Sequence, residues 1–260
     1  MTQPKDSLAR ARATKTNFKP GVTPVLILCD NSGSMQDYVD TMNKCILDLI
    51  EDLKSAPVLA NKIELAIMSF NTKCVEVLPF TRVSNINICD IKKIEPEEWA
   101  TYLGMALNES VEMLANEKEQ FKKAKTDYTQ PNLIVLSDGE PEYEDESVTN
   151  AGVRAIQNKI RNERWNCIPI FIGNNNGVEP KIMKDICVPD ASGKRDYIKF
   201  DSSDKGADIV EAFKFASMSI GAVGENADGP MANPMSSSEL KERILRNRKQ
   251  RKSFADRMKF

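Results

Sequence analysis

Short apolar runs alternate with segments of helical periodicity along residues 22–218. The first run, PVLILCD at 24–30, is continuously apolar, which is typical of a strand buried on both faces of a parallel sheet. A segment with apolar residues at helical spacing follows at 37–54. The two patterns recur and predict further strands at 62–70, 73–80, 131–138, 166–173 and 195–201, and further helices at 101–117, 147–164, 178–187 and 204–218.

The second and third predicted strands are separated only by Asn71 and Thr72, a spacing that predicts a hairpin and therefore one antiparallel strand. Elsewhere strands and helices alternate. This order indicates an α/β fold, namely a doubly wound, Rossmann-like, mostly parallel sheet with helices on both faces. Ligands of such sheets bind beyond the carboxyl ends of the strands, at the point where the strand order reverses.

Composition divides the chain into four parts. They are a basic N-terminal arm, the α/β domain, a linker rich in Gly, Ala, Asn and Pro, and a basic C-terminal helix, in the order 1–21, 22–220, 221–235 and 236–260. Ser236 and Glu239 have the spacing of a capping box that would start the last helix. Residues 1–20 carry a net charge of +4 and residues 236–260 a net +6, so the total of −2 leaves −12 for the acidic body between them.

The composition also excludes several classes of function. The chain has no histidine, which excludes Ser-His-Asp and Cys-His catalysis and the usual zinc enzymes. Its six cysteines are scattered without a C-x-x-C pair and indicate neither a disulfide framework nor a zinc site. No apolar run approaches the roughly 18–20 residues of a membrane-spanning helix. Because the basic N-terminus lacks the apolar stretch of a secretory signal, we expect a cytoplasmic protein.

The stretch CDNSGSMQD at 29–37 places two hydroxyls beside a carboxylate at the end of the first strand. Ser32 and Ser34 can both point into one loop, because Gly33 allows a tight turn between them. Asp30 can hold a coordinated water or fix one of the hydroxyls. Taken alone, this stretch fits a helix cap equally well, since Asp and Ser are preferred there.

Two further residues with oxygen-bearing side chains lie at the ends of predicted elements. Asp138 ends the strand at 131–138, and Thr101 begins the helix at 101–117. Mg²⁺ prefers about six oxygen ligands, so these residues can complete a site with the DNSGS stretch. In isolation, Asp138 also fits an Asp-Gly turn and Thr101 a helix cap.

Together the three segments resemble the metal-ion-dependent adhesion site of von Willebrand factor A domains. The chain has D-x-S-x-S, a threonine shortly before L-G and an aspartate in S-D-G-E-P, in the family's order, and the resemblance covers roughly residues 22–218. Within the family, the sequences of these three segments look most like those of bacterial TerY-type proteins, which are associated with tellurium resistance. The resemblance implies a site for Mg²⁺ or Mn²⁺ at Asp30, Ser32, Ser34, Thr101 and Asp138.

The resemblance implies a role for each of these residues. Ser32 and Ser34 would bind the metal directly, and Thr101 directly or through water. Asp30 and Asp138 would act mainly through water or hydrogen bonds. Because hydroxyl ligands leave the ion much of its charge, an acidic side chain of a protein partner can take the open position. The implied function is metal-dependent protein–protein interaction, with no catalysis and no small-molecule substrate.

The TerY-type resemblance further implies a cytoplasmic bacterial stress-response setting, with a protein kinase or a PP2C-type phosphatase as the partner. One departure is Ala100, where a glycine often precedes the threonine in relatives. Another is the acidic stretch at 140–146, which would repel an acidic ligand unless that ligand lies on a mixed or basic surface. The alternative interpretation of this stretch is a solvated loop entering a helix whose N-terminus favours acids.

Two other functions stay open at this stage. The basic helix at 236–260 could anchor the protein to nucleic acid or an anionic membrane, with binding that is lost on its deletion and depends steeply on salt. A metal-dependent phosphohydrolase is the second. It has less support, because Ser32 stands where a dehalogenase-type phosphatase has an aspartate, and the chain has neither a phosphate-binding P-loop nor a G-x-G-x-x-G after a strand.

Overall fold

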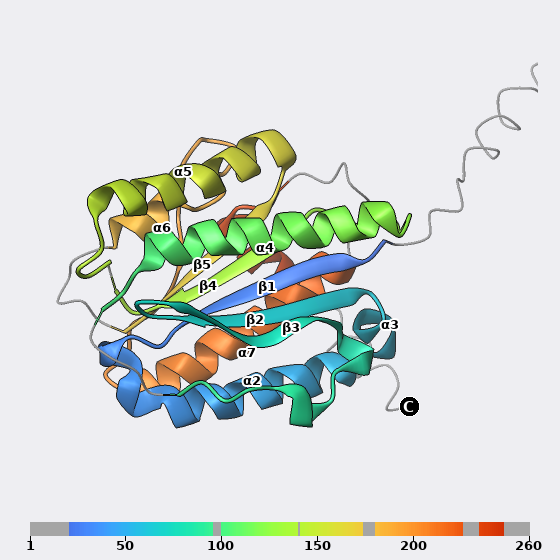
Figure 1. The fold of residues 1–260 in the computed structure, drawn as a ribbon, viewed down its shortest axis with the longest axis horizontal. Helices are drawn as coiled ribbons and strands as arrows, with labels where there is room; N and C mark the ends of the chain where they lie inside the picture. The colour runs from blue at the N-terminus through green and yellow to red at the C-terminus, as the bar shows by residue number, and fades with distance from the viewer. Residues whose placement is uncertain (1–20, 96–99, 140, 174–179, 226–233, 247–260) are drawn as a thin grey trace, which may run out of the picture.

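The computed structural model of this chain describes residues 21–95, 100–139, 141–173, 180–225 and 234–246. They form a central sheet with helices packed on both of its faces (Figure 1). Residues 1–20 of the predicted arm, most of the predicted linker and the last residues of the predicted C-terminal helix lie outside the described residues.

The strands of the sheet are β1 (Thr23–Asp30), β2 (Ile63–Phe70), β3 (Cys74–Arg82), β4 (Asn132–Ser137), β5 (Asn166–Ile172) and β6 (Ile198–Phe200). They lie in the order β3-β2-β1-β4-β5-β6. Only β3 runs antiparallel to its neighbour; the other pairs are parallel, which confirms the predicted sheet. The strand order reverses between β1 and β4, so the carboxyl ends of these two strands form the expected binding position.

The α-helices named here are α2 (Val39–Lys54), α3 (Pro57–Ala60), α4 (Leu103–Lys123), α5 (Glu146–Glu163), α6 (Lys181–Asp185) and α7 (Lys205–Glu225). Short 3₁₀ helices lie at η1 (Gly33–Tyr38), η2 (Val83–Asn85) and η3 (Ile88–Asp90). α4, α5 and α6 cover one face of the sheet, and α2, α3 and α7 cover the other (Figure 1).

Each face of the sheet has its own hydrophobic core. Val25 and Ile27 of β1 pack into the core beneath α2 and α7, whereas Leu26 and Leu28 pack into the core beneath α4 and α5. All four side chains are fully buried. The continuous apolar run of β1 is therefore required, because alternate residues fill two different cores.

Two helix boundaries differ from the prediction for identifiable reasons. α4 begins at Leu103 instead of Thr101, because Thr101 forms an isolated antiparallel bridge with Glu142. α7 continues to Glu225, five residues past the predicted domain end at 220. Ala222 is only 2% exposed and belongs to the core, so burial extends the helix into the segment predicted as linker.

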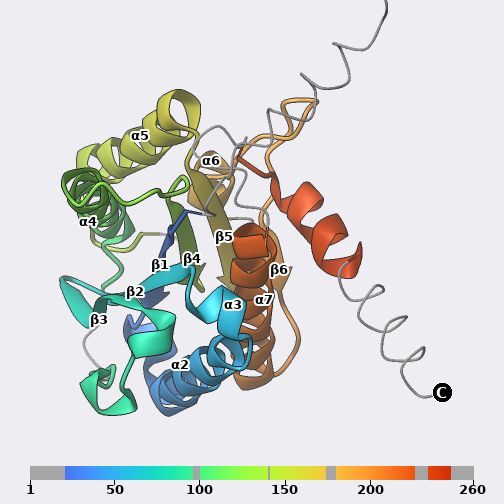
Figure 2. The ribbon, with the colours of Figure 1, turned by 90° about the vertical axis from the view of Figure 1, so that its right-hand side faces the viewer.

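The first part of the predicted basic C-terminal segment is a helix at 237–246 that is docked on the domain, beside α7 (Figure 2). Its capping box forms as predicted. Ser236 N donates to Glu239 Oε2 at 2.8 Å, and Glu239 N donates to Ser236 Oγ at 3.3 Å. Leu240 and Ile244 are buried in the same core as α2 and α7. This part of the segment is therefore a structural element of the domain.

Replacing Leu240 with alanine is expected to lower the free energy of unfolding by about 2–3 kcal/mol, because it leaves a cavity at a fully buried position. Leu245→Ala is the matched control, since Leu245 lies on the same helix but is 57% exposed. Urea denaturation followed by circular dichroism measures both. Equal stability of the two variants would show that the helix is not docked in solution.

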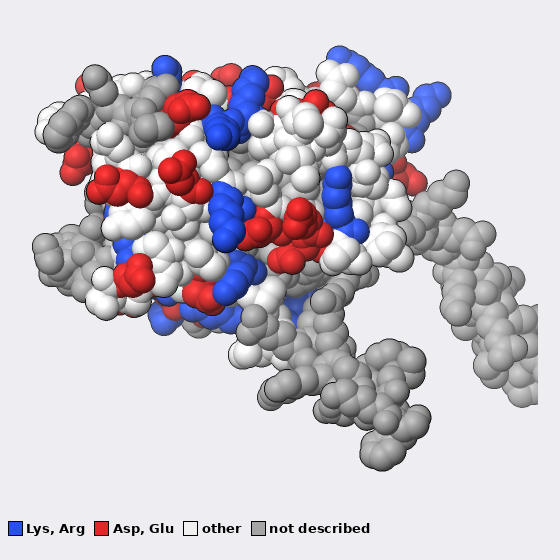
Figure 3. Space-filling model, turned by 90° about the horizontal axis from the view of Figure 1, so that it is seen from below, with Lys and Arg blue, Asp and Glu red and all other residues white. Residues whose placement is uncertain are grey.

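The face of the molecule covered by α2 has no single-sign charged surface among its described residues. On the face covered by α2, acidic and basic side chains are interspersed (Figure 3). None of the helices within the described ranges combines the length and the apolar character that a membrane span needs. The predicted anchor at 236–260 lies partly within the described residues, with Lys241 and Arg246 exposed on the docked helix, and partly outside them at 247–260.

Candidate metal site

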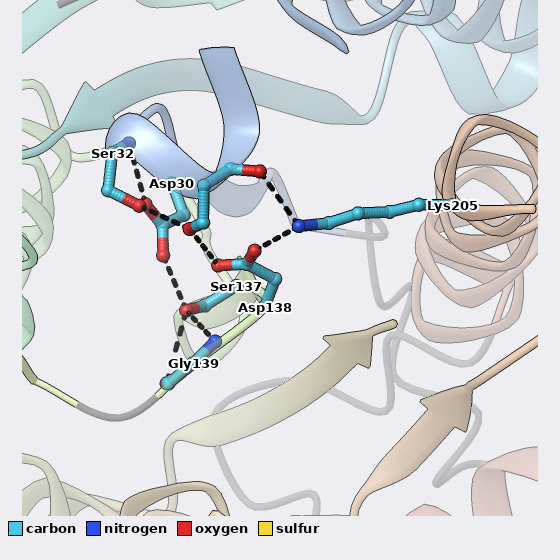
Figure 4. Close-up of polar contacts among 7 residues, drawn as sticks. Asp30, Ser32, Ser137, Asp138, Gly139 and Lys205 are labelled. Carbon is cyan, nitrogen blue, oxygen red and sulfur yellow. Dashed lines mark hydrogen bonds and ion pairs between the residues drawn. The ribbon is translucent and has the colours of Figure 1, made fainter. Parts of the chain in front are cut away.

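The predicted site residues come from three chain segments that meet at the carboxyl edge of the sheet. Asp30 is the last residue of β1, and Asp138 directly follows the last residue of β4. Because β1 and β4 are neighbours at the switch point, their ends bring the two carboxylates together. Ser32 and Ser34 follow β1, and Ser34 lies in η1. The structure places these four residues in one hydrogen-bonded cluster (Figure 4).

Asp30 is fully buried and acts as the internal support of the cluster. Its Oδ1 accepts a hydrogen bond from Ser32 N at 2.9 Å, and its Oδ2 accepts one from Ser137 Oγ at 2.6 Å. Ser137 was not among the predicted site residues. The sequence could have indicated Ser137, because this serine stands directly before Asp138 in the S-D-G-E-P segment. With both oxygens engaged, Asp30 orients the loop that carries the hydroxyls.

The two hydroxyls converge on the second carboxylate. Ser32 Oγ and Ser34 Oγ lie 3.2 Å apart, and Ser34 Oγ donates to Asp138 Oδ1 at 2.9 Å. Ser32 is 1% exposed and Asp138 8% exposed. The serine and aspartate side chains therefore contribute only oxygen atoms to the cluster, held partly out of water.

A lysine from the far end of the sequence completes the cluster. Lys205, the first residue of α7, forms an ion pair with Asp138 Oδ2 and donates to the backbone carbonyl of Ser34 at 2.9 Å. Its ammonium also lies 5.5 Å from the ring centroid of Tyr38. Sequence reasoning missed Lys205, because nothing near it in the chain marks it as part of a site.

The electrostatics of the cluster favour a cation. Burial raises the pKa of Asp30 to about 7, and the nearby charge of Asp138 acts in the same direction. Hydrogen bonds from Ser137 and Ser32 oppose this rise. Two carboxylates close together in a buried place repel each other, and a positive charge between or beside them relieves that repulsion. The Lys205 ammonium is such a charge.

Thr101 lies on the other side of a pocket of about 320 Å³, which is lined by Ser32, Gly33, Ser34, Gln36, Thr101 and Glu142. The bridge to Glu142 fixes its position: Thr101 N donates to Glu142 O at 3.3 Å, and Glu142 N donates to Thr101 O at 3.1 Å. Ser32, Ser34 and Thr101 thus line one pocket, and Asp30 and Asp138 are hydrogen-bonded to its two serines, although no hydrogen bond joins Thr101 to the serine hydroxyls. Glu142 and Gln36 are additional polar residues of this pocket.

The acidic stretch after Asp138 has mainly structural contacts in its described residues. The carboxylate of Glu144 accepts hydrogen bonds from the first backbone N–H groups of α4, those of Gly104 and Met105, both at 2.8 Å. Asp145 Oδ1 accepts from Ser147 N at 2.7 Å and caps α5. This agrees with the expected preference of helix N-termini for acids, although Glu144 caps α4 rather than α5. Glu140 lies outside the described residues.

The donor set fits a hard divalent cation. Hydroxyl and carboxylate oxygens suit Mg²⁺ and Mn²⁺, whereas soft or imidazole-binding metals need sulfur or nitrogen ligands. The described residues contain no group of three or more His, Cys, Asp or Glu side chains placed to hold a metal ion together, and the oxygens at this site come mainly from hydroxyls. The bound ammonium of Lys205 marks the position as one that already stabilises positive charge.

A family model of the von Willebrand factor type A domain matches residues 25–212. This chain belongs to that family. The match spans the sheet and includes the segments that carry the cluster. Domains of this family commonly serve as protein-interaction or adhesion modules.

Solved structures with the same fold include other von Willebrand factor A domains. The vWF domain of the type V pili tip protein Mfa5 from Porphyromonas gingivalis has a TM-score of 0.53 and 10% identity, covering 78% of this chain and 96% of that one. A von Willebrand factor type A protein from Catenulispora acidiphila has a TM-score of 0.51 and 20% identity, covering 78% and 43%. The pilus adhesin SpaC from Lactobacillus rhamnosus GG has a TM-score of 0.53 and 13% identity, covering 78% and 30%.

This chain therefore spans nearly all of the Mfa5 domain, but less than half of the Catenulispora and Lactobacillus chains. At these identities the likeness shows the fold alone. None of the curated proteins compared with this chain matches it.

Proposed function

We propose that this chain is a protein-interaction module whose binding of a partner depends on Mg²⁺ or Mn²⁺. The observation that carries the proposal is the oxygen cluster, in which Ser32 Oγ, Ser34 Oγ and Asp138 Oδ1 follow one another at 3.2 and 2.9 Å. Ser32 and Ser34 would hold the metal directly, with Thr101 across the pocket. Asp30 and Asp138 would act through water and hydrogen bonds.

We propose that the metal site binds a protein partner and catalyses no reaction. A metal held by neutral hydroxyls keeps much of its positive charge, so it can attract a carboxylate from a protein partner. Asp30 fixes Ser32 and Ser137 and is fully buried, so it cannot reach a substrate as a general base. The pocket beside Thr101 gives the incoming carboxylate access to the hydroxyls. We therefore assign the chain a non-enzymatic role.

The cellular setting rests on the resemblance to TerY-type proteins alone. By that resemblance, the chain acts in the bacterial cytoplasm in a stress-response or tellurium-resistance system. Its partner is then a signalling protein, such as a protein kinase or a PP2C-type phosphatase, that offers an acidic side chain to the metal.

The Ser32→Ala/Ser34→Ala double variant tests the proposal. It is expected to lose measurable Mg²⁺ binding in isothermal titration calorimetry, because both proposed direct ligands are removed. A pull-down from lysate with immobilised protein should recover a partner with the wild type in Mg²⁺, but not with chelator and not with the double variant. Ser55→Ala/Ser84→Ala is the matched control, since both serines are exposed and outside the cluster.

Partners that bind equally well in chelator would contradict the proposal. A truncation at residue 235 is a poor control here, because it would remove Leu240 and Ile244 from the core. Charge-neutralising changes at Lys241 and Arg246 separate the basic surface of the C-terminal helix from its packing. Loss of partners in those variants alone would favour the anchoring function instead.

A further inference from the structure

Lys205 has two contacts that belong to the proposed metal site itself. Its ammonium pairs with Asp138 Oδ2 and has no other carboxylate partner in the described residues, and it also donates to the carbonyl of Ser34 at 2.9 Å. We propose that Lys205 is a built-in cation that competes with the divalent metal for Asp138 and so sets the metal affinity of the site. This inference rests on the proposed function.

The contacts of Lys205 are those of a positioned side chain. The side chain is 22% exposed and that of Asp138 is 7% exposed, so the ion pair is largely shielded from water. The ring of Tyr38 lies beside the ammonium, at 5.5 Å. Figure 4 shows the side chain extending from α7 across to the cluster. Ion pairs of this kind are screened much less than exposed ones.

The position of Lys205 on its helix is otherwise unfavourable. It is the first residue of α7, where the helix dipole disfavours positive charge. The interaction with Asp138 offsets this cost. In return, the ammonium balances the charge of Asp138, whose side chain is only 7% exposed. The ion pair therefore stabilises the chain when no metal is bound.

A divalent metal at the serine hydroxyls would lie close to this ammonium. Ser34 connects to both sites, because its hydroxyl donates to Asp138 Oδ1 while its carbonyl accepts from Lys205. Two cations that share one carboxylate repel each other strongly at low dielectric constant. Binding of the metal therefore requires the ion pair to weaken or break.

The released side chain has room to move. A second pocket of about 380 Å³ lies beside the ion pair and is lined by Asp138, Ile172, Gly173, Asp201, Ser202, Ser203 and Lys205. Asp201, which pairs with Lys199 at 2.9 Å, and the two serine side chains can solvate an ammonium there. Lys205 can thus leave Asp138 without entering an apolar environment.

Lys205→Met is the first test, because methionine keeps most of the aliphatic stem and removes the charge. Calorimetric titration with Mg²⁺ is expected to show affinity at least about tenfold tighter than in the wild type. Lys214→Met is the matched control. Lys214 lies on the same helix, is 57% exposed and pairs with Glu211, so its loss changes net charge equally without touching the site. Lys205→Arg keeps the charge and is expected to keep the wild-type affinity.

Thermal unfolding supplies a second readout. In chelator, Lys205→Met is expected to melt below the wild type, because Asp138 loses its counter-charge. In saturating Mg²⁺ the difference is expected to vanish. The metal-induced rise in Tm is therefore larger in the variant than in the wild type or in Lys214→Met.

Chemical labelling tests the displacement in the wild-type chain, independently of how any variant folds. An amine-acylating reagent, read out by mass spectrometry, is expected to label Lys205 several-fold faster with Mg²⁺ than with chelator. Labelling of Lys214 is expected to stay constant.

An affinity of Lys205→Met within twofold of the wild type would overturn the proposal, as would Lys205 labelling that is unchanged or slower with Mg²⁺. If Mg²⁺ binds neither the wild type nor Lys205→Met, the proposed function fails together with this inference. If Mg²⁺ binds the wild type, is lost in Ser32→Ala/Ser34→Ala, and ignores Lys205, only the inference fails.

Discussion

Replacing Gly152 with alanine is expected to lower the free energy of unfolding by at least about 3 kcal/mol. A Cβ at this position would lie 2.2 Å from the carbonyl oxygen of Gly104 and 2.8 Å from its Cα. These are backbone atoms of α4, so no side chain can rotate away. α4 and α5 would have to separate, which would open the core beneath them.

The contact between α4 and α5 is equally close at Gly104. A Cβ on Gly104 would lie 2.3 Å from the Cα of Thr149 in α5. Gly104 is the glycine of the L-G segment in the family resemblance. The close contact with α5 explains why this position needs a glycine. Thr101 lies just before α4, and Glu144 caps that helix. A displaced α4 is therefore expected to weaken Mg²⁺ binding as well.

Gly221→Ala is the matched control for this prediction. Gly221 also lies within a helix, but its added Cβ would be 3.8 Å from Leu59 Cδ2, an ordinary contact. Because alanine favours helix over glycine by up to about 1 kcal/mol, this variant is expected to be as stable as the wild type or more so. Urea denaturation followed by circular dichroism compares the three proteins. A Gly152→Ala variant within about 1 kcal/mol of the wild type would show that the helices are not in close contact.

The sheet could be predicted from sequence because its signals are local. The apolar run at 24–30 and the alternation of strands with helices are properties of neighbouring residues, and they suffice to give the parallel core and its antiparallel edge. The position of Asp30 and Asp138 at adjacent strand ends follows from the same reasoning. The prediction that these residues ligate a metal still awaits its test.

Other features depend on partners far away in the chain, and no local pattern reports them. Lys205 bonds to a carbonyl 171 residues earlier, at Ser34. The bridge with Glu142 delays the start of α4 by two residues, and burial of Ala222 lengthens α7. In each case tertiary contact decides between local structures that the sequence permits equally.

Asp30→Asn is expected to stabilise the metal-free chain while it weakens metal binding. Asp30 is fully buried, and burial together with the charge of Asp138 raises its pKa to about 7. Asparagine has nearly the same shape without the charge. Its Oδ1 can still accept from Ser32 N, and the hydroxyl of Ser137 can turn toward Gly139 O, which lies 3.4 Å away. At pH 8 in chelator, the free energy of unfolding is expected to rise by about 2 kcal/mol.

The gain has a defined pH dependence. The pKa of Asp30 rises from its ordinary value of 3.8 to about 7 in the folded chain. Below about pH 4 the group is protonated in both the folded and the unfolded chain and costs nothing. Between about pH 4 and 7 the wild type loses stability as the pH rises, because the folded state must give up a proton that it binds more tightly. The advantage of Asp30→Asn is therefore expected to grow over this window and to level off above it.

Urea denaturation in chelator at several pH values measures this difference. Asp52→Asn, an exposed carboxylate on α2, is the control for charge alone and is expected to show no such window. A wild type that is as stable as Asp30→Asn at pH 8 would contradict the prediction.

Calorimetric titration is expected to show Mg²⁺ affinity about 10–100-fold weaker in Asp30→Asn, as for other residues that support metal ligands. Opposite signs for stability and affinity would identify the buried charge as a feature kept for the cation. The negative charge of Asp30 destabilises the chain until a positive charge is bound nearby. In the metal-free chain, the ammonium of Lys205 supplies part of the positive charge. If both quantities fell together, Asp30 would instead be a structural residue whose loss disturbs the loop.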